Sequence, residues 1–103
     1  MYSSIKRWVN MPAQLKVFAK RGGSGNKVYE DAKDILVYPV GDQRVATDDK
    51  GAEFVSKTQF YMDGAIALKP NDIISFDGAE YTIGSVSSYY RNGKCDLRVG
   101  YAR

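Results

Sequence analysis

Apolar and polar residues alternate with a period of two along most of this chain. The alternation is clearest in Gln14–Lys20, Glu53–Met62 and Lys94–Tyr101. Because successive side chains of a β-strand point to opposite faces, this pattern predicts strands with one apolar and one polar face. Asp34–Val40 differs, since its apolar residues follow one another almost without a break. Such a run predicts a strand covered on both faces, with Pro39 at its end or at a sheet edge.

Turn residues divide these segments into hairpins. Asp77-Gly78 separates Asp72–Phe76 from Glu80–Ile83, and the Asp-Gly pair supplies the positive φ angles of a tight hairpin turn. Arg91-Asn92-Gly93 separates Ser85–Tyr90 from the last strand in the same way. The glycine-rich segment 21–26 predicts a further reversal, which leads into a short return strand at Lys27–Asp31.

The stretch Gly41–Gly51 breaks the alternation. It is polar, has a glycine at each end and contains a single bulky apolar residue. Loops of this length are uncommon in small domains and are usually functional or disordered. We therefore take the whole stretch as a candidate functional loop, made of Gly41, Asp42, Gln43, Arg44, Val45, Ala46, Thr47, Asp48, Asp49, Lys50 and Gly51. Its adjacent carboxylates lack companions at ligand spacing, which favours a solvated tip over a metal site.

The first twelve residues predict a separate N-terminal arm. Ile5, Trp8 and Val9 have helical spacing and Pro12 would end the turn, so a short helix and an extended docking arm both remain open. The rest predicts an all-β fold, a small antiparallel barrel or sandwich of six to seven short strands with one long loop. A chain of 103 residues has room for one such domain, spanning residues 1–103.

The composition argues against catalysis. Histidine is absent and Cys95 is the single cysteine, so the usual general base, an intrachain disulfide and a thiolate metal cluster are excluded. We expect no enzyme activity, metal or cofactor, and the alternation around Cys95 predicts that it faces the core. No apolar run approaches the roughly 20 residues that span a bilayer, and Met1–Pro12 lacks the apolar core of a signal peptide. We therefore expect an intracellular origin and no membrane partner.

The net charge of +3 conceals an uneven distribution along the chain. Met1–Lys27 has six basic residues and no acid, Val28–Glu80 has eleven acids against five bases, and Tyr81–Arg103 has four bases against one acid. The basic part of one subunit would then meet the acidic part of another, or would hold nucleic acid. A solvated surface without a partner is the equally open alternative.

Exposed aromatic and basic residues mark candidate contacts with partners. Tyr89, Tyr90 and Arg91 lie beside Lys94 around the last turn, a combination that single-strand-binding barrels use to stack bases and neutralise phosphates. Inward packing of one residue of each aromatic pair is the simpler alternative. The predicted subunit or partner interface contains Lys16, Phe18, Lys20, Arg21, Tyr61, Tyr89, Tyr90 and Arg91.

The last half of the chain resembles a known family. Its segments "FVSKTQFYMDG" and "NDIISFDGAEYTIGSVSSYYRNGKCDLRVGYAR" are similar to the C-terminal half of small minor capsid proteins of tailed phages, of the head-closure type (stopper, head–tail joining). The shared elements are a Val-Ser-Lys-Thr-like strand, an Asp-Ile strand, a tight Asp-Gly turn, a Tyr-x-Ile strand and a final hairpin. The N-terminal half agrees only in size and strand content.

This resemblance implies a structural function in the virion. The expected protein is a β-barrel subunit of a ring, dodecameric in the particle, made in the bacterial host cytoplasm and placed at the head–tail joint. Its partners would be other copies of itself, the portal or adaptor above, a tail or tail-terminator protein below, and packaged double-stranded DNA in the channel. A long loop of the family projects into the channel, and Gly41–Gly51 occupies the matching place. Another phage neck or tail-completion protein and a nucleic-acid-binding barrel remain the alternatives.

Overall fold

The computed structural model describes residues 8–21, 27–29, 31–48 and 50–103, and every regular element among them is a β-strand. This confirms the all-β prediction. The strands are β1 (Met11–Lys16), β2 (Phe18–Arg21), β3 (Lys27–Tyr29), β4 (Lys33–Val40), β5 (Arg44–Thr47), β6 (Glu53–Ser56), β7 (Gln59–Asp63), β8 (Ile73–Phe76), β9 (Ala79–Arg91) and β10 (Lys94–Ala102). The N-terminal helix proposed around Ile5 lies largely outside the described residues.

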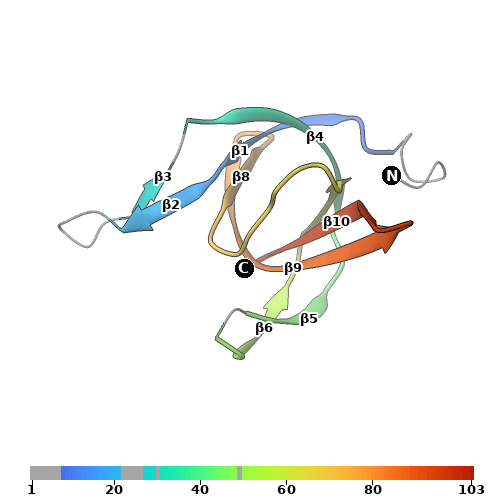
Figure 1. Cartoon of the computed structure of the whole chain (residues 1–103). Coiled ribbons are helices and arrows are strands. Elements are labelled where there is room, and N and C mark those ends of the chain that lie inside the picture. The colour runs from blue at the N-terminus through green and yellow to red at the C-terminus, as the bar shows by residue number, and fades with distance from the viewer. Residues whose placement is uncertain (1–7, 22–26, 30, 49) are drawn as a thin grey trace.

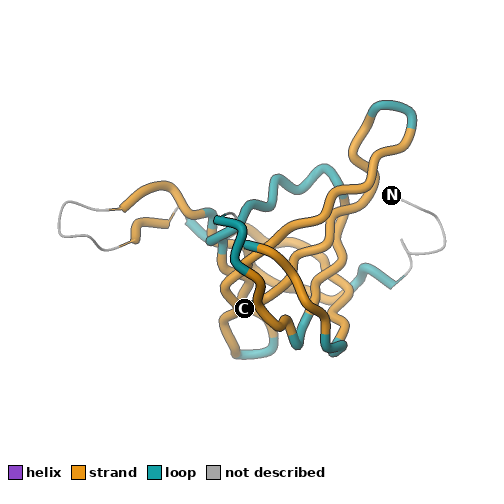
Figure 2. Tube along the Cα trace, turned by 90° about the horizontal axis from the view of Figure 1, so that it is seen from below, coloured by secondary structure: helices purple, strands orange, loops and turns teal. Residues whose placement is uncertain are grey.

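Six strands form a closed antiparallel barrel in the order β1-β4-β7-β10-β9-β8 (Figure 1). Closure removes most of the exposed strand edges that an open sheet would leave. Two further pairs, β2–β3 and β5–β6, form separate two-stranded sheets among the described residues. Figure 1 shows both extending from the barrel, and Figure 2 shows β2–β3 and the end of the β9–β10 hairpin extending in different directions.

The barrel interior is filled by apolar side chains from the barrel strands and the β7–β8 connection. Phe60, Met62, Ile74 and Ile83 are fully buried there, and Leu68 of the β7–β8 connection packs into the same core. Tyr81 and Phe76 pack against the Phe60 ring in edge-on contacts, with centroids 5.1 and 6.0 Å away. Edge-on packing suits aromatic quadrupoles, so the core combines area burial with specific ring geometry.

The two predicted turns have the expected geometry. Asp77 and Gly78 have φ angles of 51° and 80°, and Asn92 and Gly93 have angles of 52° and 77°. Positive φ at both central residues is the signature of a type I′ turn, whose twist matches that of the strands it joins. Local turn chemistry therefore fixes the β8–β9 and β9–β10 hairpins.

The barrel has six strands, as predicted, and four further strands form the two separate pairs of the described part. Two other sequence-based expectations were wrong. Asp34–Val40 is not covered on both faces, since Leu36 is 52% exposed while its neighbour Val37 is buried. Cys95 is only half-buried, and the register of β10 shifts between Cys95 and Leu97. The inward placement rested on alternation with Leu97 and Val99, whose side of β10 faces away from the barrel core, as described below.

The stretch 41–51 is also not a continuous loop. Its residues Arg44–Thr47 form β5, which pairs with β6 and places Val45 opposite Val55. The hydrophobic pattern did not predict this strand, because a short strand with one face in solvent needs few apolar residues.

β4 changes its partner along its length. Residues Met11–Leu15 of β1 pair with Lys33–Val37, whereas β7 pairs only with Tyr38–Val40 among the described strands. The edge of Lys33–Val37 that faces away from β1 therefore has no strand beside it in the described structure. This opening in the barrel wall positions the groove described below.

Candidate partner-binding surfaces

The β5–β6 hairpin presents a hydrophobic pair to solvent. Val45 and Val55 are 68% and 49% exposed and lie directly opposite each other on its outer face. Ala46 and Phe54, which alternate with them, lie on the other face and are buried and half-buried. The hairpin therefore has one face turned to the barrel and one apolar face left for another contact.

A clamp built on Arg103 holds the hairpin against the barrel. The Arg103 guanidinium forms an ion pair with the Asp48 carboxylate at 2.6 Å and lies 4.9 Å from the centre of the Phe54 ring. A Cβ at Gly84 would lie 2.6 Å from the Phe54 ring, so glycine is needed there for the ring to fit. Charge pairing and cation–π contact thus act on the same guanidinium.

Asp48 also organises the hairpin tip. Its Oδ1 accepts hydrogen bonds from the backbone N–H groups of Lys50 and Ala52 at 2.9 and 2.8 Å. The Ala52 N–H and, after it, the Arg103 guanidinium hold the pKa of the Asp48 carboxyl below its ordinary value. Of the predicted loop residues, Asp49 lies outside the described part. Arg44–Thr47 form a strand, and Asp48, Lys50 and Gly51 belong to the hydrogen-bonded turn after it, so the prediction of a solvated Asp48 tip was wrong.

Gln59 fixes the base of the hairpin. Its side-chain amide is buried and donates to the backbone carbonyl of Asp42 at 2.8 Å and to that of Ser56 at 3.1 Å. One side chain of β7 therefore holds the segments that enter and leave the hairpin. Together with Arg103, it turns the predicted loop into an anchored projection.

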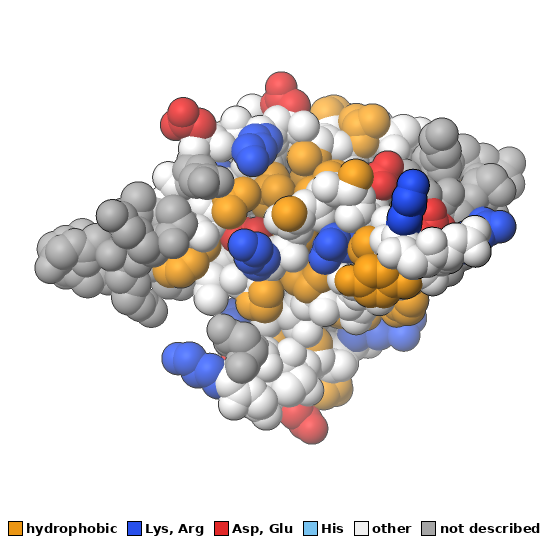
Figure 3. All heavy atoms as spheres, in the orientation of Figure 1, with side chains coloured by type: hydrophobic (Ala, Val, Ile, Leu, Met, Phe, Trp, Pro, Cys, Tyr) orange, Lys and Arg blue, Asp and Glu red, His pale blue; other side chains and the backbone are white. Residues whose placement is uncertain are grey.

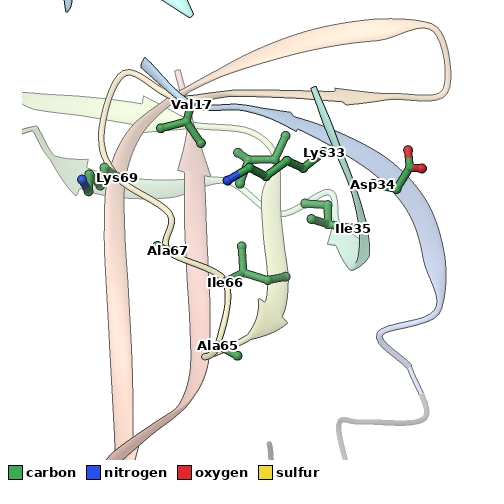
Figure 4. A pocket seen from close by; sticks show the side chains of 9 residues that line it. Val17, Lys33, Asp34, Ile35, Ala65, Ile66, Ala67 and Lys69 are labelled. Atoms are coloured by element: carbon green, nitrogen blue, oxygen red, sulfur yellow. The ribbon is translucent and has the colours of Figure 1, made fainter. Parts of the chain in front are cut away.

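A groove of about 460 Å³ opens where β4 leaves β7. Its walls come from the start of β4, the β1–β2 junction and the β7–β8 connection, and its lining residues are Leu15, Val17, Lys33, Asp34, Ile35, Ala65, Ile66, Ala67 and Lys69. In Figure 4, Ile35 and Ile66 face each other across the groove, Lys33 extends over it and Asp34 points away. The groove thus combines an apolar floor with ammonium groups along its border.

A cluster of aromatic residues covers the outside of the wall formed by the end of β4, β7, β10 and β9. Trp8 lies 6.1 Å from Tyr38, and Tyr38 lies 6.0 Å from Tyr61, between ring centres. Tyr101 and Tyr89 continue the cluster across β10 and β9, and we call these five residues the tyrosine surface. In Figure 3, apolar side chains gather beside the end of the β9–β10 hairpin, among lysines and arginines.

The tyrosine surface covers residues that the sequence placed in the core. Ala102 packs in the barrel core and Gly100 approaches Leu68 and Ile83, so alternation turns Leu97 and Val99 to the outside, where both are buried. Partial burial raises the pKa of the Tyr89 phenol, and the neighbouring Tyr101 phenol raises it further. Tyr89 therefore stays neutral at physiological pH.

The structure brings together only part of the predicted interface. Tyr61 and Tyr89 belong to the tyrosine surface, and Tyr90 and Arg91 lie exposed at the end of the β9–β10 hairpin. Lys16 lies on β1, across the barrel from β10, and forms an ion pair with Glu80 at 2.8 Å. The side chains of Lys20 and Arg21 lie outside the described residues.

Phe18 contacts a single aromatic neighbour in the described structure, the Tyr29 ring on β3, with centroids 5.8 Å apart. It therefore belongs to the β2–β3 hairpin and not to the tyrosine surface. Sequence reasoning missed Trp8, Tyr38 and Tyr101 as members of that surface. The tyrosine content was the signal that could have found them, but their proximity depends on the order of strands in the barrel.

Two kinds of site are not found in the described part of the chain. No group of three Cys, Asp or Glu residues there is placed to hold a metal ion. The same residues contain no helix with the length and hydropathy of a membrane span.

The fold itself has a relative among solved structures. No protein-family model and no curated protein sequence matches this chain. Its structure is similar to that of the phage-like element PBSX protein xkdH from Bacillus subtilis, with a TM-score of 0.50 and 12% sequence identity. The similarity covers 88% of this chain and 92% of the other. The chain therefore has the fold of a protein from a phage-like element, over almost its full length.

Proposed function

We propose that this chain is a non-enzymatic structural protein of a tailed-phage particle, a head-closure subunit at the head–tail joint. The observation that carries the proposal is the barrel it shares with a protein of a phage-like element over 88% of its length. The resemblance of its last half to head-closure proteins supports the same assignment independently of the fold. The ring would retain packaged DNA and offer the tail its attachment surface.

The geometry suits a ring subunit. Head-to-tail contacts need two different surfaces on each copy, and the β5–β6 hairpin, the groove and the tyrosine surface are three such features. Aromatic residues with a polar end are enriched at protein interfaces. Copies of this chain, the portal or adaptor above and a tail or terminator protein below are the partners we propose, with DNA passing through the centre.

Immunogold labelling of particles that encode the protein tests this function. We expect label at the head–tail joint, and we expect loss of the gene to give heads that package DNA, release it and lack tails. Absence of the protein from particles would overturn the proposal. Label farther down the tail would favour a tail-completion protein and contradict head closure.

Retention of DNA by the 41–51 hairpin needs a more conservative variant than a deletion. Removal of Gln43–Lys50 would delete β5, leave β6 unpaired and uncover Phe54. Replacing residues 48–52 by Asn-Gly instead keeps Thr47 opposite Glu53 and shortens the projection, because a two-residue type I′ turn closes that register. We expect rings to assemble and DNA to leak. Full retention of DNA would remove the gating role.

The end of the β9–β10 hairpin favours a second candidate function, the binding of nucleic acid. Tyr90 is 64% exposed there, beside the exposed cations Arg91 and Lys94. A nucleic-acid-binding barrel would use this end to stack bases, and its binding would weaken steeply with salt. Salt-dependent oligonucleotide binding by the monomer, abolished by Tyr89→Ala with Tyr90→Ala, would favour this alternative. Its absence would favour the ring.

A further inference from the structure

The outer face of the β5–β6 hairpin lacks a counterpart within the described structure. Val45 and Val55 form a cross-strand pair, and Glu53 lies on the same face beside Val55, toward the tip. Lys57 follows at the opposite end of that face, where the chain returns to the barrel. A two-stranded ribbon also leaves strand edges open to pairing with another chain.

The groove offers features that match this face. Ile35 and Ile66 pack against the barrel core and provide an apolar floor, and the Lys33 ammonium lies over it in Figure 4. Lys69 is a second cation in the lining, at the far end of the β7–β8 connection. The adjacent edge of Lys33–Val37 has no strand beside it among the described residues. The apolar face of the hairpin therefore matches the apolar floor of the groove, its carboxylate matches the two ammonium groups, and its strand edge matches the unpaired edge of β4.

We propose that the β5–β6 hairpin of one copy docks in the groove of a neighbouring copy. Val45 and Val55 contact the apolar floor, Glu53 faces Lys33 and Lys69, and the hairpin edge lies along the unpaired part of β4. This inference deepens the proposed function, on which it rests, by naming the two surfaces that join ring subunits.

The positions of the two features on the barrel fit a contact that repeats. In Figure 1 the β5–β6 hairpin hangs below the barrel, whereas β1 and β4, which border the groove, run along its top. A hairpin cannot reach the groove of its own subunit from there. Contacts between different surfaces are heterologous and generate rings when the rotation closes.

Two variants, each defective in one half of the contact, test the proposal. Val45→Ser with Val55→Ser removes the anchors, and Lys33→Glu with Lys69→Glu reverses the charge of the groove. Because the proposed contact buries both valines, their loss should weaken self-association on the order of 100-fold. Sedimentation velocity measures association, urea midpoints verify folding, and Lys94→Glu serves as the control, because this exposed lysine lies outside both the groove and the β5–β6 hairpin.

Mixing the two variants gives the decisive result. One retains an intact groove and the other an intact hairpin, so we expect one-to-one pairs that cannot grow further. Failure to form pairs, or association that survives in either variant alone, would overturn the proposed contact. Neither result would contradict the proposal that the protein forms a ring. A wild-type chain that stays monomeric at about millimolar concentration, with NMR shifts independent of concentration, would also overturn it. The expected pairs together with absence from particles would support the contact and refute head closure.

Discussion

Asp72 is a single buried carboxylate that joins two distant parts of the backbone. Its Oδ1 accepts from the Phe18 N–H at 2.8 Å and its Oδ2 from the Lys69 N–H at 2.9 Å. Asp72→Ala would leave both donors without this acceptor, and we expect a loss of about 3 kcal/mol in the free energy of unfolding. Urea denaturation measures the change. Asp31→Ala, at an exposed position, is the control, and equal effects of the two substitutions would contradict the role.

Gly64 is a second position where one atom decides the fit. A Cβ there would overlap the carbonyl group of Cys95, which belongs to the backbone and cannot swing aside. We expect Gly64→Ala to destabilise the barrel by about 1–3 kcal/mol through overpacking. Gly41→Ala is the matched control, because a Cβ at Gly41 meets nothing within 4 Å. Thermal melting of both variants separates crowding from a general effect of adding a methyl group.

At the scale of elements, the sequence predicted what local chemistry determines. Asp77-Gly78 and Asn92-Gly93 specify their turns through backbone conformations that few other residues adopt. β5 escaped prediction because its order depends on Arg103 and Gln59, which lie far away in the chain. The outward direction of Val99 was missed for a related reason, since only the closed barrel shows which face of β10 meets tyrosines.

The hairpin clamp should respond to pH through Asp48. The pKa of this carboxyl is lowered in the folded protein, so its stabilising effect is complete above the ordinary value of 3.8 and is lost as the pH falls through the lowered value. We expect the Lys50 and Ala52 amides to lose hydrogen-exchange protection in that acid range while barrel amides keep theirs. Asp48→Asn should remove most of the pH dependence of that protection. Protection that persists unchanged at acid pH would show that the carboxylate does not hold the tip.

For the whole molecule, part of the charge segregation along the sequence disappears in the fold. Lys16 from the basic N-terminal part pairs with Glu80, and Arg103 from the basic C-terminal part pairs with Asp48 of the acidic middle. Contacts that the sequence assigned to neighbouring subunits are thus partly made within one chain. The Lys16–Glu80 pair depends on the barrel closure of β1 onto β8, a long-range contact that charge counts along the sequence do not contain.

The tyrosine surface is where we expect the folded molecule to meet a partner in the particle. Tyr38 and Tyr89 are 36% and 46% exposed, so Tyr38→Ser with Tyr89→Ser should change the free energy of unfolding by only about 1 kcal/mol. Because exposed aromatic residues often dominate interface energy, we expect the same variant to be incorporated into particles on the order of tenfold less. Quantitative mass spectrometry of purified particles measures incorporation. Tyr29→Ser, on β3 outside this surface, is the control, and normal incorporation of the double variant would show that the surface faces solvent in the particle.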